Sequence, residues 1–82
     1  MVIFDDKNEF LRLFGMRLEY FRTEQNLSFR QLAQQCNLDH SDIRKIEKGK
    51  RNIQLSTILE LAKGLGIQPK ELFDFEMRID KA

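Results

Sequence analysis

The middle third of the chain carries the clearest pattern of apolar and polar positions, and this pattern predicts two short amphipathic helices joined by a tight turn. Leu32, Ala33 and Cys36 fall on one face at helical spacing, with polar residues between them. Ile43 and Ile46 repeat that spacing after the turn. Each segment therefore has one face to bury against the rest of a small core.

Polar residues that favour helix ends lie at the expected ends of these two segments. Ser28 and Asp39 can each accept a hydrogen bond from the free amides of a first helical turn. Asn37 stands in the turn, and asparagine tolerates left-handed backbone better than most other residues. Two capped helices around a tight turn, between residues 28 and 48, form the pattern of a helix-turn-helix, which favours DNA as the partner.

An apolar stripe predicts a long first helix. Apolar side chains recur at spacings of four, four and three at Phe10, Phe14, Leu18 and Phe21. We expect a helix from about Asp6 to Gln25, with Asn26 ending it. Gly15 weakens this helix and permits close packing against a neighbour.

Two further helices are predicted in the last third of the chain. Ser56 is expected to cap a fourth helix, whose apolar face ends before Gly66. A fifth helix is expected from Pro69 to about Asp74, because proline suits the first helical position. The pattern then changes, since Phe73, Phe75, Met77 and Ile79 alternate with charged residues. Strict alternation suggests a strand, although Leu72, Phe75 and Ile79 also fit a helix face, so both alternatives stay open.

Composition bounds the class of protein. Eighty-two residues make one small domain. No apolar run approaches the roughly 20 residues that a membrane span needs, so no membrane role is expected. The single Cys36 cannot form an intramolecular disulfide, which fits a reducing cytoplasm. It falls on the apolar side of its helix and is expected to be buried rather than redox-active.

The net charge is only +1, but the positive charge is concentrated in the predicted helix-turn-helix. Residues 28–52 hold six Lys and Arg against three Asp and Glu, which gives +3, whereas the flanking segments 1–27 and 53–82 each give −1. Clustered positive charge is what a phosphate backbone requires. Charge alone would equally fit an ordinary solvated face.

The segment from about Phe14 to Phe73 resembles the Cro/C1-type helix-turn-helix family, the phage-repressor and XRE-like regulators. The motifs that carry the resemblance are Arg22, Ser28, Leu32-Ala33, Ile43, Ile46-Glu47-x-Gly49, Leu61-Ala62, Leu65-Gly66 and Glu71-Leu72-Phe73. The resemblance implies an all-α, compact five-helix, lambda-repressor-like domain over residues 14–74, with the helix-turn-helix proper at 28–48. Residues 1–13 would be an N-terminal extension continuing into the first helix, and residues 75–82 a C-terminal tail.

Residues that face outward on the second helix of the motif are the candidates for reading bases. Positions that reach base edges from a helix in the major groove correspond to His40, Ser41, Arg44 and Lys45. The family's base-reading positions match His40, Ser41 and Lys45, and Arg44, where the family often has Ser, is added for its reach and charge. The alternative is an exposed polar face without a DNA role.

A second set of residues is predicted to bind phosphate. At the start of the motif, Ser28, the amide of Phe29 and Gln34 would meet an anion at a helix N-terminus. Ser28 can do this and still act as a cap. Three departures from the family pattern lie nearby: Phe29 replaces a frequent Gln, Asn37 the usual turn Gly, and Ile53 a Pro. After the motif, a basic loop would clamp the backbone with Lys48, Lys50, Arg51 and Asn52.

Other chemistry is not supported by the residue pattern. Arg22 and Glu47 resemble a family pair that ties the first helix to the third, which we interpret as structural. No residue with ligand spacing accompanies His40, so no metal and no cofactor is expected. No nucleophile with a base and no carboxylate pair is evident, so an enzyme is not expected.

The sequence therefore predicts a sequence-specific regulator that binds double-stranded DNA as a homodimer on a palindromic operator. The dimer is expected to use the fifth helix and the apolar tails, because Met1 to Phe4 and the residues after Leu72 leave apolar side chains to spare. The alternative is a protein-interaction module of the same fold, such as an antitoxin that neutralises a toxin, because a fold does not determine function.

Overall fold

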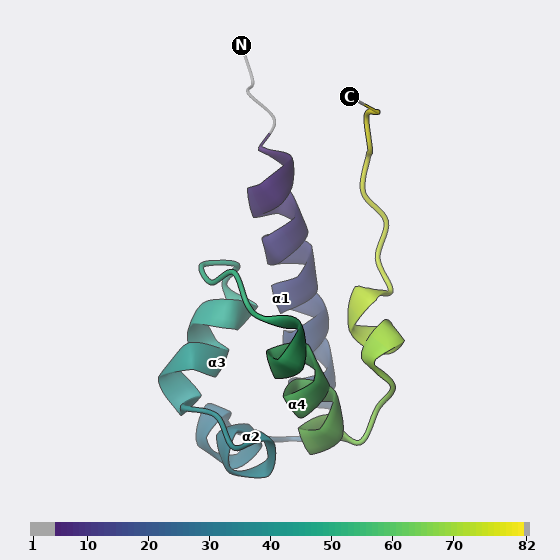
Figure 1. Ribbon diagram of the computed structural model, residues 1–82. Coiled ribbons are helices and arrows are strands. Elements are labelled where there is room, and N and C mark those ends of the chain that lie inside the picture. The colour runs from purple at the N-terminus through teal and green to yellow at the C-terminus, as the bar shows by residue number, and fades with distance from the viewer. Residues whose placement is uncertain (1–4, 82) are drawn as a thin grey trace.

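A computed structural model describes residues 5–81 as a small bundle of helices (Figure 1). The helical elements in chain order are α1 (Asp6–Glu24), α2 (Phe29–Cys36), α3 (His40–Glu47), α4 (Leu55–Leu65) and the 3-10 helix η1 (Pro69–Phe73). In the described part of the chain there is no strand. The all-α class predicted from the sequence is confirmed.

The long first helix has the ends that its sequence predicts. The side chain of Asp5 accepts from the amide of Asn8 at 3.2 Å and so caps the N-terminus. At the other end Gln25 is the C-cap, and Asn26 follows with a left-handed φ of 57°. A helix cannot continue through that conformation, so the chain turns there towards α2.

The core takes one fully buried aliphatic side chain from each helical element. These residues, each with 0% exposure, are Leu18, Leu32, Ile43, Leu61 and Leu72. α2 packs on α4, and α1 packs on α3. The motif of α2 and α3 is therefore supported from behind by the two longest helices, which leaves the outer faces of α2 and α3 free.

Two glycines allow helices to approach each other closely. A Cβ atom on Gly15 of α1 would collide with the backbone carbonyls of Ile46 and Glu47 in α3. A Cβ atom on Gly64 of α4 would collide with the sulfur of Cys36 in α2. Cys36 itself is 1% exposed, and burial raises the pKa of its thiol to about 11. The sequence prediction for Gly15 is thus confirmed, and that for Cys36 as a buried side chain as well.

The fourth helix begins earlier than the sequence predicts. Its N-cap is Gln54, which makes no side-chain capping bond, and Ser56 lies inside the first turn. Ile53 packs against the core just before this point. Anchoring the chain there lets Leu55 start the helix, with the Gln54 carbonyl accepting from the amides of Thr57 and Ile58. The prediction of Ser56 as the cap is wrong.

The predicted fifth α-helix is a single short stretch of 3-10 helix instead. Pro69 occupies its first turn as expected, and the carboxylate of Glu71 accepts from the amide of the N-cap residue Gln68 at 2.9 Å. Asp74 already has a non-helical ψ of 72°. Five residues are too few to repay the cost of starting a helix, and 3-10 geometry is common in such short pieces. Over residues 5–81 the fold therefore has four α-helices and one 3-10 helix, not the five helices predicted.

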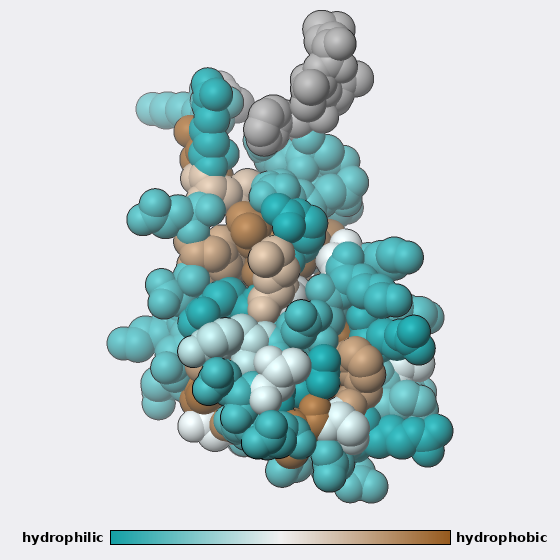
Figure 2. All heavy atoms as spheres, turned by 180° about the vertical axis from the view of Figure 1, so that it is seen from behind, coloured by the Kyte–Doolittle hydropathy of each residue, from teal (hydrophilic) through white to brown (hydrophobic). Residues whose placement is uncertain are grey.

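The C-terminal segment is neither of the two alternatives left open by its pattern. Residues 74–81 run without regular structure beside α1 (Figure 1), because no neighbouring strand is present among residues 5–81 to pair with them. The segment is held by aromatic contacts, with the ring of Phe75 5.7 Å from that of Phe10 and the ring of Phe73 5.2 Å from that of Phe14. Figure 2 shows apolar side chains gathered between this segment and α1. Met1 to Phe4, expected to add apolar surface, lie outside the described residues.

Candidate nucleic-acid interface

α2 begins at a complete capping box, which fixes where its N-terminus points. The hydroxyl oxygen of Ser28 accepts from the amide of Gln31 at 3.1 Å, and the side-chain oxygen of Gln31 accepts from the amide of Ser28 at 2.8 Å. The spacing Ser-x-x-Gln carries this signal, so the partner role of Gln31 was available from the sequence. The cap still leaves the exposed Ser28 hydroxyl proton free to donate.

The turn between the two helices follows from two residues. Asn37 is left-handed, with a φ of 56°, and closes α2 through a bond from its amide to the carbonyl of Ala33. Asp39 then caps α3, since its carboxylate accepts from the amide of Ser41 at 3.1 Å. These backbone constraints set the position of α3, called the recognition helix below.

The first two candidate base readers lie against the capping carboxylate. The hydroxyl of Ser41 donates to Asp39 at 3.1 Å, and Nδ1 of His40 is 3.5 Å from the same carboxylate oxygen. The pKa of Asp39 is lowered, chiefly because its carboxylate accepts the Ser41 amide and then the Ser41 hydroxyl. Asp39 therefore stays ionised in ordinary conditions and holds these two exposed side chains at the start of the recognition helix.

The other two candidates, Arg44 and Lys45, are exposed along the recognition helix. Neither forms an ion pair with any residue between 5 and 81. Ile43 and Ile46 on the opposite side are 0% and 3% exposed, so they anchor the helix to the core. Because Ile43 and Ile46 fix the orientation of the helix, the charged groups of Arg44 and Lys45 stay exposed to solvent.

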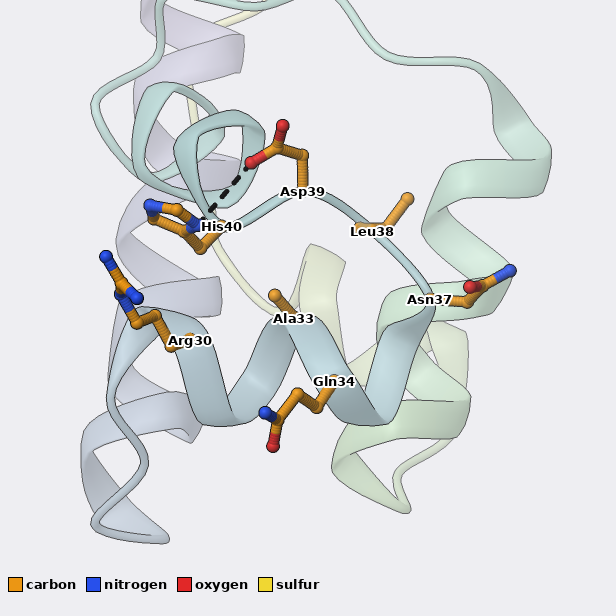
Figure 3. A pocket seen from close by; sticks show the side chains of 7 residues that line it. All are labelled: Arg30, Ala33, Gln34, Asn37, Leu38, Asp39 and His40. Atoms are coloured by element: carbon orange, nitrogen blue, oxygen red, sulfur yellow. Dashed lines mark ion pairs between the residues drawn. The ribbon is translucent and has the colours of Figure 1, made fainter.

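A hollow of about 470 Å³ lies between α2 and the start of the recognition helix. Arg30 of α2 and His40 both line this hollow, and Figure 3 shows them on the same side of it, with the dashed contact from His40 to Asp39. Gln34, a predicted phosphate contact, also lines it. The place of Arg30 beside a base-reading position was missed from the sequence, where only its charge was counted.

The basic loop, residues 48–52, leaves the recognition helix through Gly49, whose φ of 72° favours glycine. Lys48, Lys50 and Asn52 are exposed as a phosphate clamp requires. Arg51 is also exposed, but its Nη2 donates to the carboxylate of Asp42 at 2.6 Å. The sequence prediction placed the loop correctly and did not anticipate this pair.

Arg22 and Glu47 form the pair that the resemblance implied. Arg22 Nε and Nη2 donate to the two carboxylate oxygens of Glu47 at 2.6 and 3.0 Å, and its Nη1 donates to the carbonyl of Leu27 at 2.8 Å. The Glu47 side chain is 2% exposed. Burial raises the pKa of its carboxyl, although the hydrogen bonds and charge of Arg22 act in the opposite direction. The pair ties the end of α1 to the end of the recognition helix.

Phe29, the departure from the family pattern at the start of α2, has a structural role. Its ring centroid lies 4.1 Å from the guanidinium carbon of Arg22, a cation–π contact. The side chain also packs against the core. The ring therefore takes no place on the outer face, and only the Phe29 amide is left for the phosphate contact predicted from the sequence.

Metal ligands do not gather anywhere in the described part of the chain. Among residues 5–81, no three His, Cys, Asp or Glu side chains come close enough to hold an ion. No helix within that range is long and apolar enough to cross a membrane.

Comparison with known proteins agrees with this geometry. A family model described as helix-turn-helix matches residues 18–72. The control protein C.BamHI of Bacillus amyloliquefaciens is 41% identical over 69 residues, covering 83% of this chain and 85% of that protein. The control protein C.MunI of a Mycoplasma species is 41% identical over 61 residues, covering 73% of this chain and 82% of that protein.

A solved structure extends the agreement to three dimensions. The restriction-modification controller protein C.AhdI from Aeromonas hydrophila superimposes with a TM-score of 0.76 and is 46% identical. The alignment covers 77% of this chain and 96% of C.AhdI. Because nearly all of C.AhdI is matched, the likeness extends well beyond the motif of α2 and α3.

Proposed function

The chain belongs to the helix-turn-helix family of transcriptional regulators, and we propose that it binds a palindromic operator as a homodimer and regulates restriction-modification genes. The observation that carries the proposal is the row of exposed, unpaired cations on a recognition helix whose back is locked into the core. The relatives named as control proteins support the narrower role of a controller. Their descriptions give no support to an antitoxin.

Base reading is assigned to the outer face of the recognition helix. Arg44 and Lys45 have free cationic heads that suit guanine O6 and N7 in the major groove. His40 and Ser41 are held by Asp39 and would present a donor or an acceptor at the N-terminal end of the helix. These four residues lie where a helix inserted in the groove meets base edges.

Phosphate binding is assigned to both flanks of the recognition helix. On one flank the amide of Phe29 and the hydroxyl of Ser28 lie at the α2 N-terminus. The side chain of Gln34, further along α2, lines the hollow between α2 and the recognition helix. On the other flank the basic loop contributes Lys48, Lys50, Arg51 and Asn52. Such contacts set the register of the protein on the duplex without reading its sequence.

Dimerisation is assigned to an apolar face formed by the start of α4 and by η1. Leu55 is 83% exposed, Leu59 one turn later is 48% exposed, and Phe73 is 37% exposed. Leu55 and Phe73 line the same hollow of about 200 Å³, which connects the start of α4 with η1. In the C-terminal tail, which the sequence also assigned to the interface, Phe75 packs against Phe10 of the same chain, whereas Ile79 is 73% exposed and is available to a second subunit.

A binding titration tests the proposal. The probes are the promoter-proximal DNA upstream of the chain's own gene and a duplex of the same length and composition in scrambled order. We expect a controller to bind the upstream duplex at least ~10³-fold more tightly at physiological salt. Equal affinity for the two duplexes would contradict operator recognition.

A further inference from the structure

Arg51 differs from the other Lys and Arg side chains of the interface because a carboxylate holds it. Its Nη2 donates to Oδ1 of Asp42 at 2.6 Å, a short charge-assisted bond from the basic loop to the recognition helix. As far as residues 5–81 are described, the remaining basic side chains of segment 28–52 form no ion pair; these are Arg30, Arg44, Lys45, Lys48 and Lys50.

The pair is poorly placed to stabilise the fold but well placed to fix the guanidinium. The Arg51 and Asp42 side chains are 43% and 40% exposed, and ion pairs at such positions contribute little to stability. Arg51 and Asp42 both border a hollow of about 250 Å³, so the Arg51 stem is not enclosed by packed side chains on that side. The Asp42 carboxylate is therefore what sets the position of the charged head.

A held arginine and a free arginine differ in what they offer to DNA. A guanidinium has five N–H donors, and Asp42 engages only Nη2. The remaining donors are presented at one place relative to the recognition helix. A free Arg51 would instead reach phosphates over a wide range on any duplex, and such contacts carry no sequence information.

We propose that Asp42 is a specificity-determining residue that acts through Arg51. By holding the guanidinium beside the recognition helix, it makes the Arg51 phosphate contact available only when that helix is fully seated in the groove. Asp42 thus lowers binding to unrelated DNA and leaves operator binding intact. This inference rests on the operator binding proposed above.

The test measures the ratio of operator affinity to scrambled-duplex affinity across a salt titration. Asp42→Asn should strengthen binding to the scrambled duplex about fivefold at 0.15 M salt, because the released Arg51 adds one phosphate contact. For the same reason, the slope of log affinity against log salt should become steeper by about 0.9. Operator affinity should change less than about twofold, because Arg51 already makes its contact there. Thermal unfolding should be nearly unchanged, since both side chains are exposed.

Three companion variants separate this role from a general charge effect. In an Arg51→Gln background, Asp42→Asn should change neither affinity, because the group through which it acts is gone. Asp42→Glu keeps a carboxylate within reach and should preserve the ratio. Glu9→Gln removes the carboxylate of another exposed pair, with Arg12 on α1, and should also preserve it.

Two results would overturn the inference alone. One is a wild-type protein that binds the operator more tightly than the scrambled duplex, together with an Asp42→Asn protein whose ratio of the two affinities equals that of the wild type. The other is an equal gain in scrambled-duplex binding with and without Arg51, which would show a simple loss of negative charge near DNA. A wild-type protein that does not discriminate between the duplexes would overturn the proposed function, and the inference with it.

Discussion

At the scale of single residues, Arg22 connects three parts of the molecule through one guanidinium group. It bonds to Glu47 at the end of the recognition helix, to the carbonyl of Leu27 before α2, and stacks on the ring of Phe29. Arg22 thereby fixes the positions of α2 and the recognition helix relative to the end of α1. The energetic consequence depends on Glu47, whose carboxylate is almost fully buried.

Arg22→Ala should destabilise the protein by about 3–5 kcal/mol, because it leaves the buried Glu47 carboxylate without its partner. Urea unfolding followed by circular dichroism measures the change. Arg12→Ala is the matched control: it breaks an exposed pair with Glu9 at 2.7 Å and should cost less than about 1 kcal/mol. Similar losses of unfolding free energy for the two variants would show that the buried pair stabilises the protein no more than the exposed pair does.

Changing Lys45 and changing Lys50 to alanine should affect DNA binding in different ways. Lys45→Ala should cost about 1–3 kcal/mol on the operator and relax discrimination at one base pair in each half-site. Lys50→Ala should weaken operator and scrambled duplexes alike and reduce the salt slope by about one. Competition titrations at several salt concentrations distinguish the two patterns. An equal loss on both duplexes for Lys45→Ala would make Lys45 a backbone contact.

The sequence predicted local features of the interface better than it predicted side-chain pairing. Ser28 and Asp39 act as caps because a cap needs only its own helix end. The bond between Arg51 and Asp42, and the place of Arg30 beside His40, depend on how α2, α3 and the basic loop are oriented in space. Spacing along one chain does not contain that information.

At the scale of helices, close packing between α2 and α4 depends on the absence of one side chain. Alanine normally favours a helix over glycine by about 1 kcal/mol. At Gly64 the added methyl group would collide with the sulfur of Cys36. Because well-packed cores tolerate extra atoms poorly, the collision should outweigh the gain in helix propensity.

Gly64→Ala should therefore destabilise the protein, by about 1–3 kcal/mol in chemical unfolding. The same change in a Cys36→Ala background should lose most of its cost, because the sulfur has been removed. Lys63→Ala, at an exposed neighbouring position, should have little effect. A penalty that persists without the sulfur would place the clash on the α2 backbone instead.

Elements with a long apolar stripe were predicted well, and short or unpaired ones were not. α1, Asp6–Glu24, ends one residue before the predicted Gln25, because an apolar stripe of four residues marks most of its length. α4 starts before Ser56 because Ile53 is drawn into the core, a tertiary effect. The alternating pattern after Phe73 has no strand to pair with in residues 5–81, so its aromatic residues pack on α1 instead.

At the scale of the whole molecule, the proposed dimer face can be tested by mutation, because Leu55 is exposed and can be changed without disturbing the core. Leu55→Glu should shift the protein from dimer to monomer at micromolar concentration, since two like charges would meet across a two-fold interface. Sedimentation equilibrium measures the shift. Met16→Glu, at an exposed apolar position on α1, should remain dimeric. A dimer that survives Leu55→Glu would move the interface elsewhere.

In the proposed dimer, one recognition helix per subunit reads half of a two-fold operator. One helix contacts too few base pairs to select a site in a genome, and a symmetric pair doubles the contacts. Dimeric operator binding uses the helix-turn-helix fold, the cationic outer face and the apolar dimer face together.

Selection from a pool of random duplexes, with sequencing of the bound fraction, tests that claim most directly. We predict a motif with two-fold symmetry whose half-sites lie about one DNA turn apart, near 10 base pairs or about 34 Å centre to centre. The motif should lose information at one position per half-site when Lys45→Ala protein is used. A single half-site without a symmetric partner would contradict the dimeric account, and no enrichment at all would contradict sequence-specific binding.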